Sequence, residues 1–135
     1  MKCAVVLTLS LLLGFLPAAA DDLKGTAEIP FPFIVAGKTL PAGEYEIYKP
    51  TSLSRYALWL REIRTHQAVI CLVNMDDTGI HKESKLVFNR YNDQVFLRTV
   101  VLDGEASTLL KSKAEKTLIA AGAGRATETV MAYHK

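Results

Sequence analysis

Residues 85–102, KLVFNRYNDQVFLRTVVL, contain two runs rich in Val, Phe, Leu and Tyr on either side of Asn92 and Asp93. Asn and Asp tolerate the positive φ angles that a two-residue hairpin loop requires. The stretch therefore predicts a β-hairpin. With Asn92 and Asp93 as the loop, the facing pairs are Tyr91 with Gln94, Arg90 with Val95, Phe88 with Leu97, and Leu86 with Thr99.

This register divides the hairpin into two faces, because neighbouring residues of a strand point to opposite sides. We expect one face to be core, with Leu86, Phe88, Val95, Leu97 and Val101. The other face is mixed and carries Val87, Asn89, Tyr91, Gln94, Phe96, Arg98 and Val100. Burial of each core side chain contributes about 1.5–3 kcal/mol. A lone hairpin is marginally stable, so further strands are expected beside it.

The first twenty residues have the three parts of a secretory signal peptide: a short basic start, an apolar run over 3–16, and small residues ending at Ala20. The apolar run is short for a membrane span, so we expect cleavage after Ala20, with a retained anchor as the alternative. Cys3 stands at the start of the apolar run, whereas the lipidated cysteine of a lipoprotein signal follows that run, so Cys3 does not indicate a lipoprotein. The sequence predicts export to the periplasm or the medium, with no integral membrane segment after cleavage.

Residues 21–135 have the length of a single domain. The whole chain carries 16 basic and 14 acidic residues, a near balance that gives no electrostatic field for nucleic acid. Cys71 is the only cysteine outside the signal segment, so no intramolecular disulfide is expected. A small buried residue in a strand is the favoured role for Cys71, and a reactive or intermolecular thiol is the alternative.

Two segments upstream of the central hairpin alternate between apolar and other residues. Residues 29–35 have apolar side chains at every second position, and the prolines between them suit an edge strand. After a turn over 37–43, residues 44–48 resume the alternation, which predicts a second hairpin. Residues 21–28 are polar and are expected to fray.

The middle of the chain predicts two more strands. Residues 55–64 are compatible with a helix or a strand. We favour a strand because the apolar residues Tyr56, Leu58 and Leu60 occupy every second position. Residues 67–75, QAVICLVNM, form a near-continuous apolar and β-branched run. Such a run is typical of a strand that is buried on both faces.

Beyond residue 104 the apolar period changes to that of a helix. The repeating residues are Leu110, Ala114, Leu118 and Ala121, which predicts a helix near 106–121. Ser107 is the expected N-cap and Gly122 the stop. We expect Leu110 and Leu118 to pack on the sheet. A last edge strand is expected over 127–133.

The order Pro-Phe-x-Phe, Gly-Lys-x-Leu-Pro-x-Gly-x-Tyr over residues 30–45, followed by Lys-Leu-Val-Phe-x-Arg-Tyr over 85–91, resembles a family of small exported bacterial β-proteins of unassigned function. One residue's difference in spacing separates this chain from that pattern. The resemblance implies a β-rich exported domain over nearly all of residues 21–135. It implies no catalytic residues, since its motifs consist of turn glycines and core apolar residues.

The histidines do not form a metal site in the sequence. His66, His81 and His134 have no ligand spacing and no companion cysteines, so solvent exposure is favoured over metal binding. Asp76, Asp77 and His81 share one loop, yet this loop lacks the alternating oxygen ligands and the closing Glu of a calcium loop. We expect no metal and no cofactor.

Enzymatic patterns are also missing. No serine lies in a Gly-x-Ser-x-Gly elbow, and no glycine-rich phosphate loop is present. Glu44 and Glu46 fall on one side of their strand, where a solvated face is favoured over a pair of catalytic carboxylates. The sequence therefore predicts a protein that is not an enzyme.

Four aromatic residues remain if the opposite faces of their strands hold the core: Tyr48, Trp59, Tyr91 and Phe96. Aromatic residues left on a strand surface belong to a second packing layer or to a binding patch. We favour packing, and keep a ligand or partner surface as the alternative.

We predict a mostly antiparallel β-domain of six to seven strands, a partly open barrel or sandwich with one C-terminal α-helix. The function we expect is that of an exported, non-catalytic binding module for a small apolar or amphipathic ligand or a protein partner. The alternative is a structural or envelope-assembly subunit that associates through edge strands at 29–35 and 127–133. The sequence indicates no oligomeric state.

Overall fold

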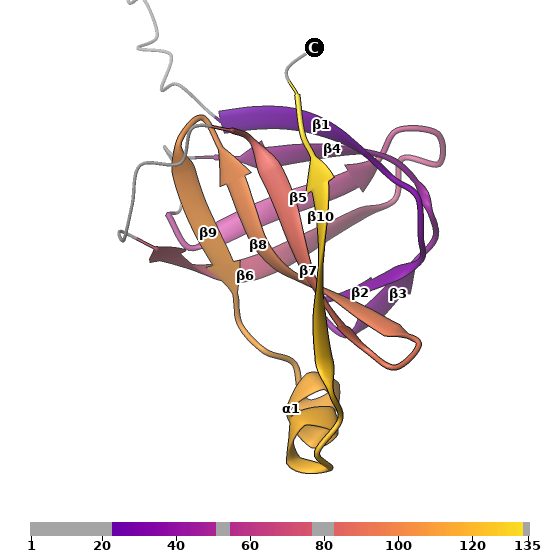
Figure 1. Cartoon of the computed structure of the whole chain (residues 1–135). Helices are drawn as coiled ribbons and strands as arrows, with labels where there is room; N and C mark the ends of the chain where they lie inside the picture. Colours follow the sequence, from indigo (N-terminus) through magenta and orange to yellow (C-terminus); the bar gives the residue numbers. More distant parts are fainter. Residues whose placement is uncertain (1–22, 51–54, 77–82, 134–135) are drawn as a thin grey trace, which may run out of the picture.

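The structure is a computed structural model, and it describes residues 23–50, 55–76 and 83–133. These residues form ten β-strands and one α-helix (Figure 1). The elements are β1 (Leu23–Ile29), β2 (Phe33–Val35), β3 (Lys38–Leu40), β4 (Gly43–Lys49), β5 (Ala57–Glu62), β6 (Ala68–Asp76), β7 (Lys85–Tyr91), β8 (Gln94–Leu102), β9 (Glu105–Leu109), α1 (Lys113–Ala120) and β10 (Arg125–Met131). The described part of the chain is mostly β with one helix, as predicted, but it has more strands than the six or seven expected.

The strands form one open, mixed sheet. Its order is β1-β4-β5-β6-β9-β8-β2-β3, with β7 between β8 and β10. Among the described strands, all pairs are antiparallel except β2 with β8, which is parallel at Ile34 and Phe96. The sheet is therefore mixed, although mostly antiparallel as the sequence predicts. In Figure 1 the strands β7 to β10 cross in front of β4, β5 and β6, and the core lies between these two parts of the sheet.

The two far edges of the sheet, β1 and β10, come together at a bridge. The Thr26 N–H donates to the Tyr133 carbonyl at 2.7 Å, and the Tyr133 N–H donates to the Thr26 carbonyl at 2.9 Å. Within the described residues β1 pairs along its length with β4, and β10 with β7. The predicted last strand over 127–133 is thus confirmed as β10, whereas the sheet stays open because β1 and β10 share no ladder.

The central hairpin is β7 and β8, joined at Asn92, whose φ is 53°. Three of the four predicted pairs are confirmed, but a bulge between Val87 and Phe88 leaves Arg98 unpaired. Leu86 therefore faces Val100 and not Thr99. Because one extra residue reverses the alternation, Val100 and Leu102 join the main core in place of Val101, which is buried outside it.

The main core contains the other predicted hairpin residues and a group of aromatic rings. Phe33 packs edge to face on Tyr45 and on Phe88, with ring centroids 5.1 and 5.6 Å apart. Leu86, Phe88, Val95 and Leu97 are all buried, as expected. Apolar side chains from both parts of the sheet thus fill one interior.

The prediction for the N-terminal edge strand is wrong in two respects. Residues 23–29, expected in part to fray, form β1 and pair with β4 over seven residues. The strand expected over 29–35 is interrupted at Pro30 and Pro32, because proline has no N–H for a ladder. The segment Phe33–Val35 then forms its hairpin with β3, not with residues 44–48.

The helix predicted near 106–121 begins later in the structure than expected. Residues 105–109 form β9, which pairs with β6 on one side and β8 on the other. The helix α1 begins after Ser112, whose hydroxyl accepts from the Glu115 N–H at 3.3 Å. Leu110 is exposed and Leu118 half-buried, while Glu115 is the buried residue of α1, so the helix does not pack through the predicted apolar stripe.

In the middle of the chain, β5 and β6 confirm the preference for strands over a helix. Cys71 on β6 is buried, as expected. No helix in the described part of the chain has the length and apolar character to cross a membrane. The predicted signal peptide over 1–20, Asp77, His81 and His134 lie outside the described residues.

Candidate functional site

The two faces of β5 and β6 differ in their exposure to solvent. Strand alternation turns Leu58, Leu60, Val69, Cys71 and Val73 into the core. It turns the intervening residues outward, where Trp59 is 42% exposed, Ile70 57% and Leu72 64%. The expectation that residues 67–75 are buried on both faces is therefore wrong. We call Lys24, Tyr48, Trp59, Ile70 and Leu72 the outer face.

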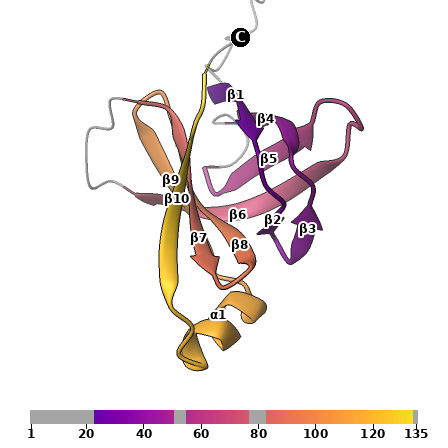
Figure 2. The ribbon, with the colours of Figure 1, turned by 45° about the vertical axis from the view of Figure 1, so that its right-hand side comes forward.

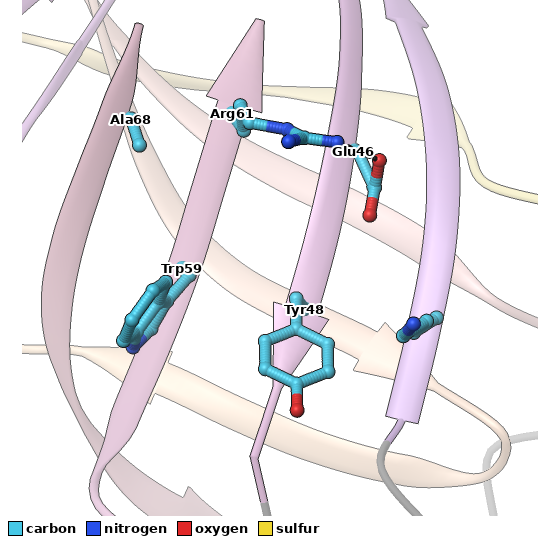
Figure 3. A pocket seen from close by; sticks show the side chains of 6 residues that line it. Glu46, Tyr48, Trp59, Arg61 and Ala68 are labelled. Atoms are coloured by element: carbon cyan, nitrogen blue, oxygen red, sulfur yellow. Dashed lines mark hydrogen bonds and ion pairs between the residues drawn. The ribbon is translucent and has the colours of Figure 1, made fainter. Parts of the chain in front are cut away.

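Four members of the outer face lie in one row across four strands. The sheet register places Lys24 opposite Tyr48, Tyr48 opposite Trp59, and Trp59 opposite Ile70. The rings of Tyr48 and Trp59 have centroids 6.2 Å apart and are inclined by 81° (Figure 3). The Lys24 ammonium lies 5.3 Å from the centre of the Tyr48 ring, which is cation–π geometry.

A shallow hollow of about 280 Å³ lies along this row. It is lined by Lys24, Glu46, Tyr48, Trp59, Arg61 and Ala68. Arg61 Nη2 donates to Glu46 Oε2 at 2.8 Å across one side of the hollow (Figure 3). A partly exposed pair of this kind contributes about 0–1 kcal/mol to stability. The site therefore combines an apolar and aromatic surface with charged groups at its rim.

The predicted aromatic set falls into two separate pairs. Tyr48 and Trp59 share the outer face, whereas Tyr91 and Phe96 are 1% and 3% exposed and contact each other with centroids 5.9 Å apart. Tyr91 and Phe96 therefore do not form an exposed surface. Packing explains these two residues.

Helix α1 contacts Tyr91 of the second pair through Glu115. The Tyr91 hydroxyl donates to Glu115 Oε1 at 3.1 Å, and Asn89 Nδ2 donates to the same oxygen at 3.3 Å. Burial, and then the hydrogen bond and charge of Glu115, raise the pKa of Tyr91. Figure 2 shows α1 at the end of the β7–β8 hairpin, so a buried carboxylate holds this helix to the sheet.

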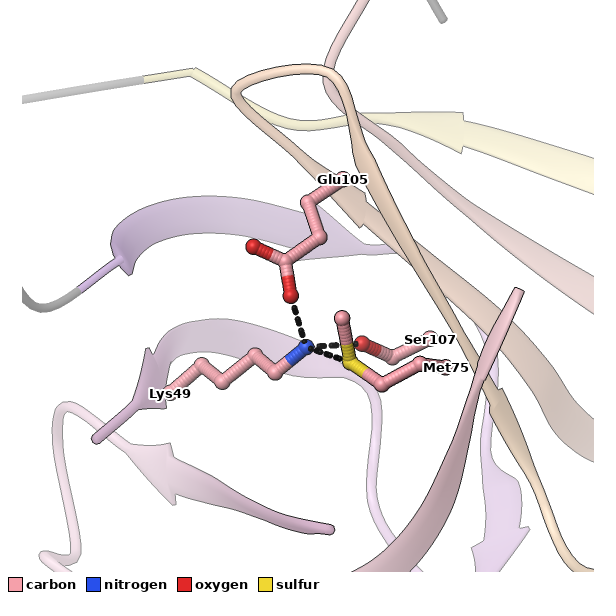
Figure 4. Close-up of polar contacts among 4 residues, drawn as sticks. All are labelled: Lys49, Met75, Glu105 and Ser107. Atoms are coloured by element: carbon pink, nitrogen blue, oxygen red, sulfur yellow. Dashed lines mark hydrogen bonds and ion pairs between the residues drawn. The ribbon is translucent and has the colours of Figure 1, made fainter. Parts of the chain in front are cut away.

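A buried lysine, Lys49, is the centre of a second polar cluster inside the sheet (Figure 4). Lys49 is 2% exposed, and its Nζ donates to Glu105 Oε1 at 2.5 Å, to Ser107 Oγ at 2.7 Å and to Met75 Sδ at 2.8 Å. A serine beside a lysine is one arrangement for nucleophilic catalysis. Here all three N–H donors of the ammonium have acceptors, one of them a carboxylate. The cluster fits a structural ion pair and not a base for Ser107.

The described residues contain no group of three or more His, Cys, Asp and Glu that could hold a metal ion. His66 lies in the turn between β5 and β6. Burial raises the pKa of the Cys71 thiol to about 12, which disfavours a reactive thiolate. Glu44 and Glu46 both lie on the outer side of β4, where Glu46 pairs with Arg61.

The sequence reasoning did not find Lys24, Ile70 and Leu72. The signal for Ile70 and Leu72 was present, because both occupy alternate positions of a strand. The run around them is apolar on both sides, however, and periodicity alone does not say which side is covered.

Comparisons of the chain with protein-family models, with curated proteins and with solved structures find no match. The resemblance to small exported β-proteins and the signal peptide stay predictions from the sequence.

Proposed function

We propose that this protein is a non-catalytic binding module that holds a protein partner on its outer face. The row of Lys24, Tyr48, Trp59 and Ile70 carries the proposal. A continuous exposed apolar patch with a polar rim is characteristic of an interaction surface. Export of the protein, predicted from its first twenty residues, is part of the proposal.

The outer face adds little to the stability of the fold. Side chains on the inner faces of the same strands already form the core, and Trp59, Ile70 and Leu72 of the outer face project into solvent. A partner that covers Ile70 and Leu72 gains about 25 cal/mol for each Å² of apolar surface removed from water. Aromatic residues such as Trp59 are enriched in interface cores.

The charges around the hollow indicate the chemistry of the partner. Lys24 and Arg61 bring two positive groups to its rim, with Glu46 paired to Arg61. A partner with an apolar patch bordered by acidic groups complements this surface. A ligand held within the sheet is less favoured, because core side chains occupy the interior.

The test compares Ile70→Lys with Ile119→Lys, a matched change at an exposed isoleucine of α1. Each full-length protein is purified from its own host, and bound proteins and small molecules are identified by native mass spectrometry. We expect one partner to accompany the wild type and the Ile119 variant and to be lost from the Ile70 variant. Equal recovery from all three proteins, or no partner with any of them, would contradict the proposal.

Association through strand edges is the second candidate. Of the edges expected at 29–35 and 127–133, the first is not free, because β2 has neighbours on both sides. The second agrees with the structure: among the described strands β10 pairs only with β7, and its bridge to β1 lies beyond its end, at Tyr133. Among the described strands, β1 and β3 end the sheet order and β10 ends the branch through β7, and these edges favour this candidate. Sedimentation of the wild type over a wide concentration range tests self-assembly, and a strict monomer would exclude it.

A further inference from the structure

A second hollow, of about 460 Å³, lies between β3 and the first half of β6. Its lining residues are Lys38, Thr39, Leu40, Gln67, Ala68 and Val69. β9 pairs with β6 over Val73–Asp76, and the β2–β3 hairpin joins β8 at Phe96. In the part of the chain that the structure describes, no strand pairs with β6 on this side before Leu72 or with the outer edge of β3.

The first half of β6 directs main-chain groups into this hollow. The Val73 N–H donates to the Tyr56 carbonyl on the β5 side at 2.9 Å, and the Leu72 carbonyl accepts from the Leu110 N–H on the opposite side at 3.3 Å. Main-chain groups of successive strand residues alternate between the two edges. The N–H and C=O of Ala68 and Ile70 therefore point away from β5.

The edge of β3 presents main-chain groups from the other wall. Ala36 and Gly37 form a two-residue turn with φ of 50° and 75°. In such a hairpin the residues that flank the turn, Val35 and Lys38, exchange hydrogen bonds with each other. The next pair, Ile34 and Thr39, does not. Thr39 belongs to that next pair, so its N–H and C=O point away from β2.

The floor of the hollow is apolar. Leu40 and Val69 belong to the hydrophobic core but each keeps 7% of its surface exposed. Lys38 contributes a positive charge at the β3 wall. Two main-chain edges, an apolar floor and one cation together match an extended peptide, whose N–H and C=O groups alternate along its length and need partners.

We propose that an extended segment of the protein partner binds between β3 and β6 as an added strand. It hydrogen-bonds to Thr39 on one side and to Ala68 and Ile70 on the other, places an apolar side chain over Leu40 and Val69, and turns an acidic side chain toward Lys38. Strand addition of this kind draws affinity from the main chain and specificity from alternate side chains. The inference rests on the proposed function, in which the partner is a protein.

The two surfaces are continuous. Ala68 lines both this hollow and the hollow of the outer face. Ile70 presents its side chain on the outer face and its main chain to the gap. One partner can therefore contribute a strand to the gap and an apolar surface to the outer face.

The experiment selects random heptapeptides, displayed on phage, against the full-length protein, and then measures the affinity of the selected peptides as synthetic compounds. We expect them to alternate apolar and acidic or polar residues. Thr39→Pro removes the outward N–H and leaves the β2 pairing, because proline is tolerated at edge positions. This variant should bind about tenfold more weakly, while Thr39→Ala should bind as the wild type does.

Hydrogen exchange in the wild-type protein gives a second measurement that needs no variant. Peptide binding should slow exchange at the amides of Thr39, Ala68 and Ile70. Unchanged exchange there, equal affinity for Thr39→Pro and the wild type, or failure to select any peptide would overturn the strand site. If Ile70→Lys loses the host partner and Thr39→Pro keeps it, the outer-face function stands and the strand site falls.

Discussion

The inner and outer faces of β5 and β6 are built from similar residues but have different surroundings. Leu60 and Cys71 face the core, and Trp59, Ile70 and Leu72 face solvent on the same two strands. Hydrophobic composition alone does not distinguish these faces. The difference teaches that one face of these strands stabilises the domain, whereas the other leaves its apolar side chains in solvent.

The strongest test of this contrast is a pair of leucine truncations. Leu60→Ala should lower the free energy of unfolding by about 2–5 kcal/mol, because Leu60 is fully buried and its removal leaves a cavity. Leu72→Ala should change it by less than about 0.5 kcal/mol, because that side chain is mostly in solvent. Urea unfolding followed by circular dichroism measures both. Similar losses in the two variants would remove the distinction between the faces.

A close contact inside the sheet gives the next largest effect. A Cβ atom at Gly25 would lie 2.6 Å from Leu102 Cδ2, well inside contact distance. Gly25→Ala should therefore lower the free energy of unfolding by about 1–3 kcal/mol through overpacking. Leu102→Ala, combined with it, should relieve that part of the loss, and thermal melts of the two single variants and the double variant measure the coupling. Purely additive losses would show that Gly25 is not limited by Leu102.

The buried thiol adds a pH dependence to the inner face. The pKa of Cys71 is raised from 9.0 to about 12 by burial, so the folded state holds the proton more tightly than the unfolded state. The stability that the buried thiol contributes to the folded state is complete below pH 9. It is lost as the pH rises toward 12, and the free energy of unfolding falls by roughly 1 kcal/mol per pH unit. Urea unfolding between pH 8 and pH 11 should show a steeper decline for the wild type than for Cys71→Ala. Parallel declines would mean that the thiol does not contribute.

The smallest effect on stability, and the most direct readout of exposure, comes from thiol labelling. In the folded wild type, Cys71 should react with a disulfide reagent at pH 8 only as the protein unfolds. The double variant Cys71→Ala with Ile70→Cys moves the thiol by one residue to the outer face, where it should react at the rate of a free thiol. A fast reaction of the native Cys71 would contradict the burial of the inner face.

Local patterns were sufficient for the central hairpin and for β5. Asn92 supplies the positive φ at the turn, and alternation on either side sets three of the four predicted pairs. The bulge at Arg98 was not predictable from these patterns, since it reflects how β8 meets its neighbours. That single residue exchanged Val101 for Val100 in the main core.

The helix shows where local patterns failed. Residues 105–109 read as the start of a helix, but pairing with β6 and β8 fixes them as a strand. β6 lies far from β9 along the chain, so a local pattern does not reveal this pairing. Tertiary hydrogen bonding therefore outweighs the helical period, and the helix begins only after the cap at Ser112.

Two of the five outer-face residues were within reach of the sequence. Tyr48 and Trp59 were expected on the faces opposite the core, and they share the outer face. Tyr91 and Phe96 met the same criterion, but both are buried: Tyr91 contacts Glu115 of α1, and Phe96 packs on Tyr91. Tertiary neighbours, which include Glu115 of α1 for Tyr91, separate the exposed pair from the buried pair.

By itself the sequence determined the β class, the central hairpin and the alternation of most strands, because these follow from side-chain period and turn chemistry between near neighbours. The tertiary structure decided which apolar side of β6 is covered, which residues join the core after the bulge, and which strand edges stay free. These outcomes depend on pairing between segments that are distant along the chain, and no local period encodes that pairing.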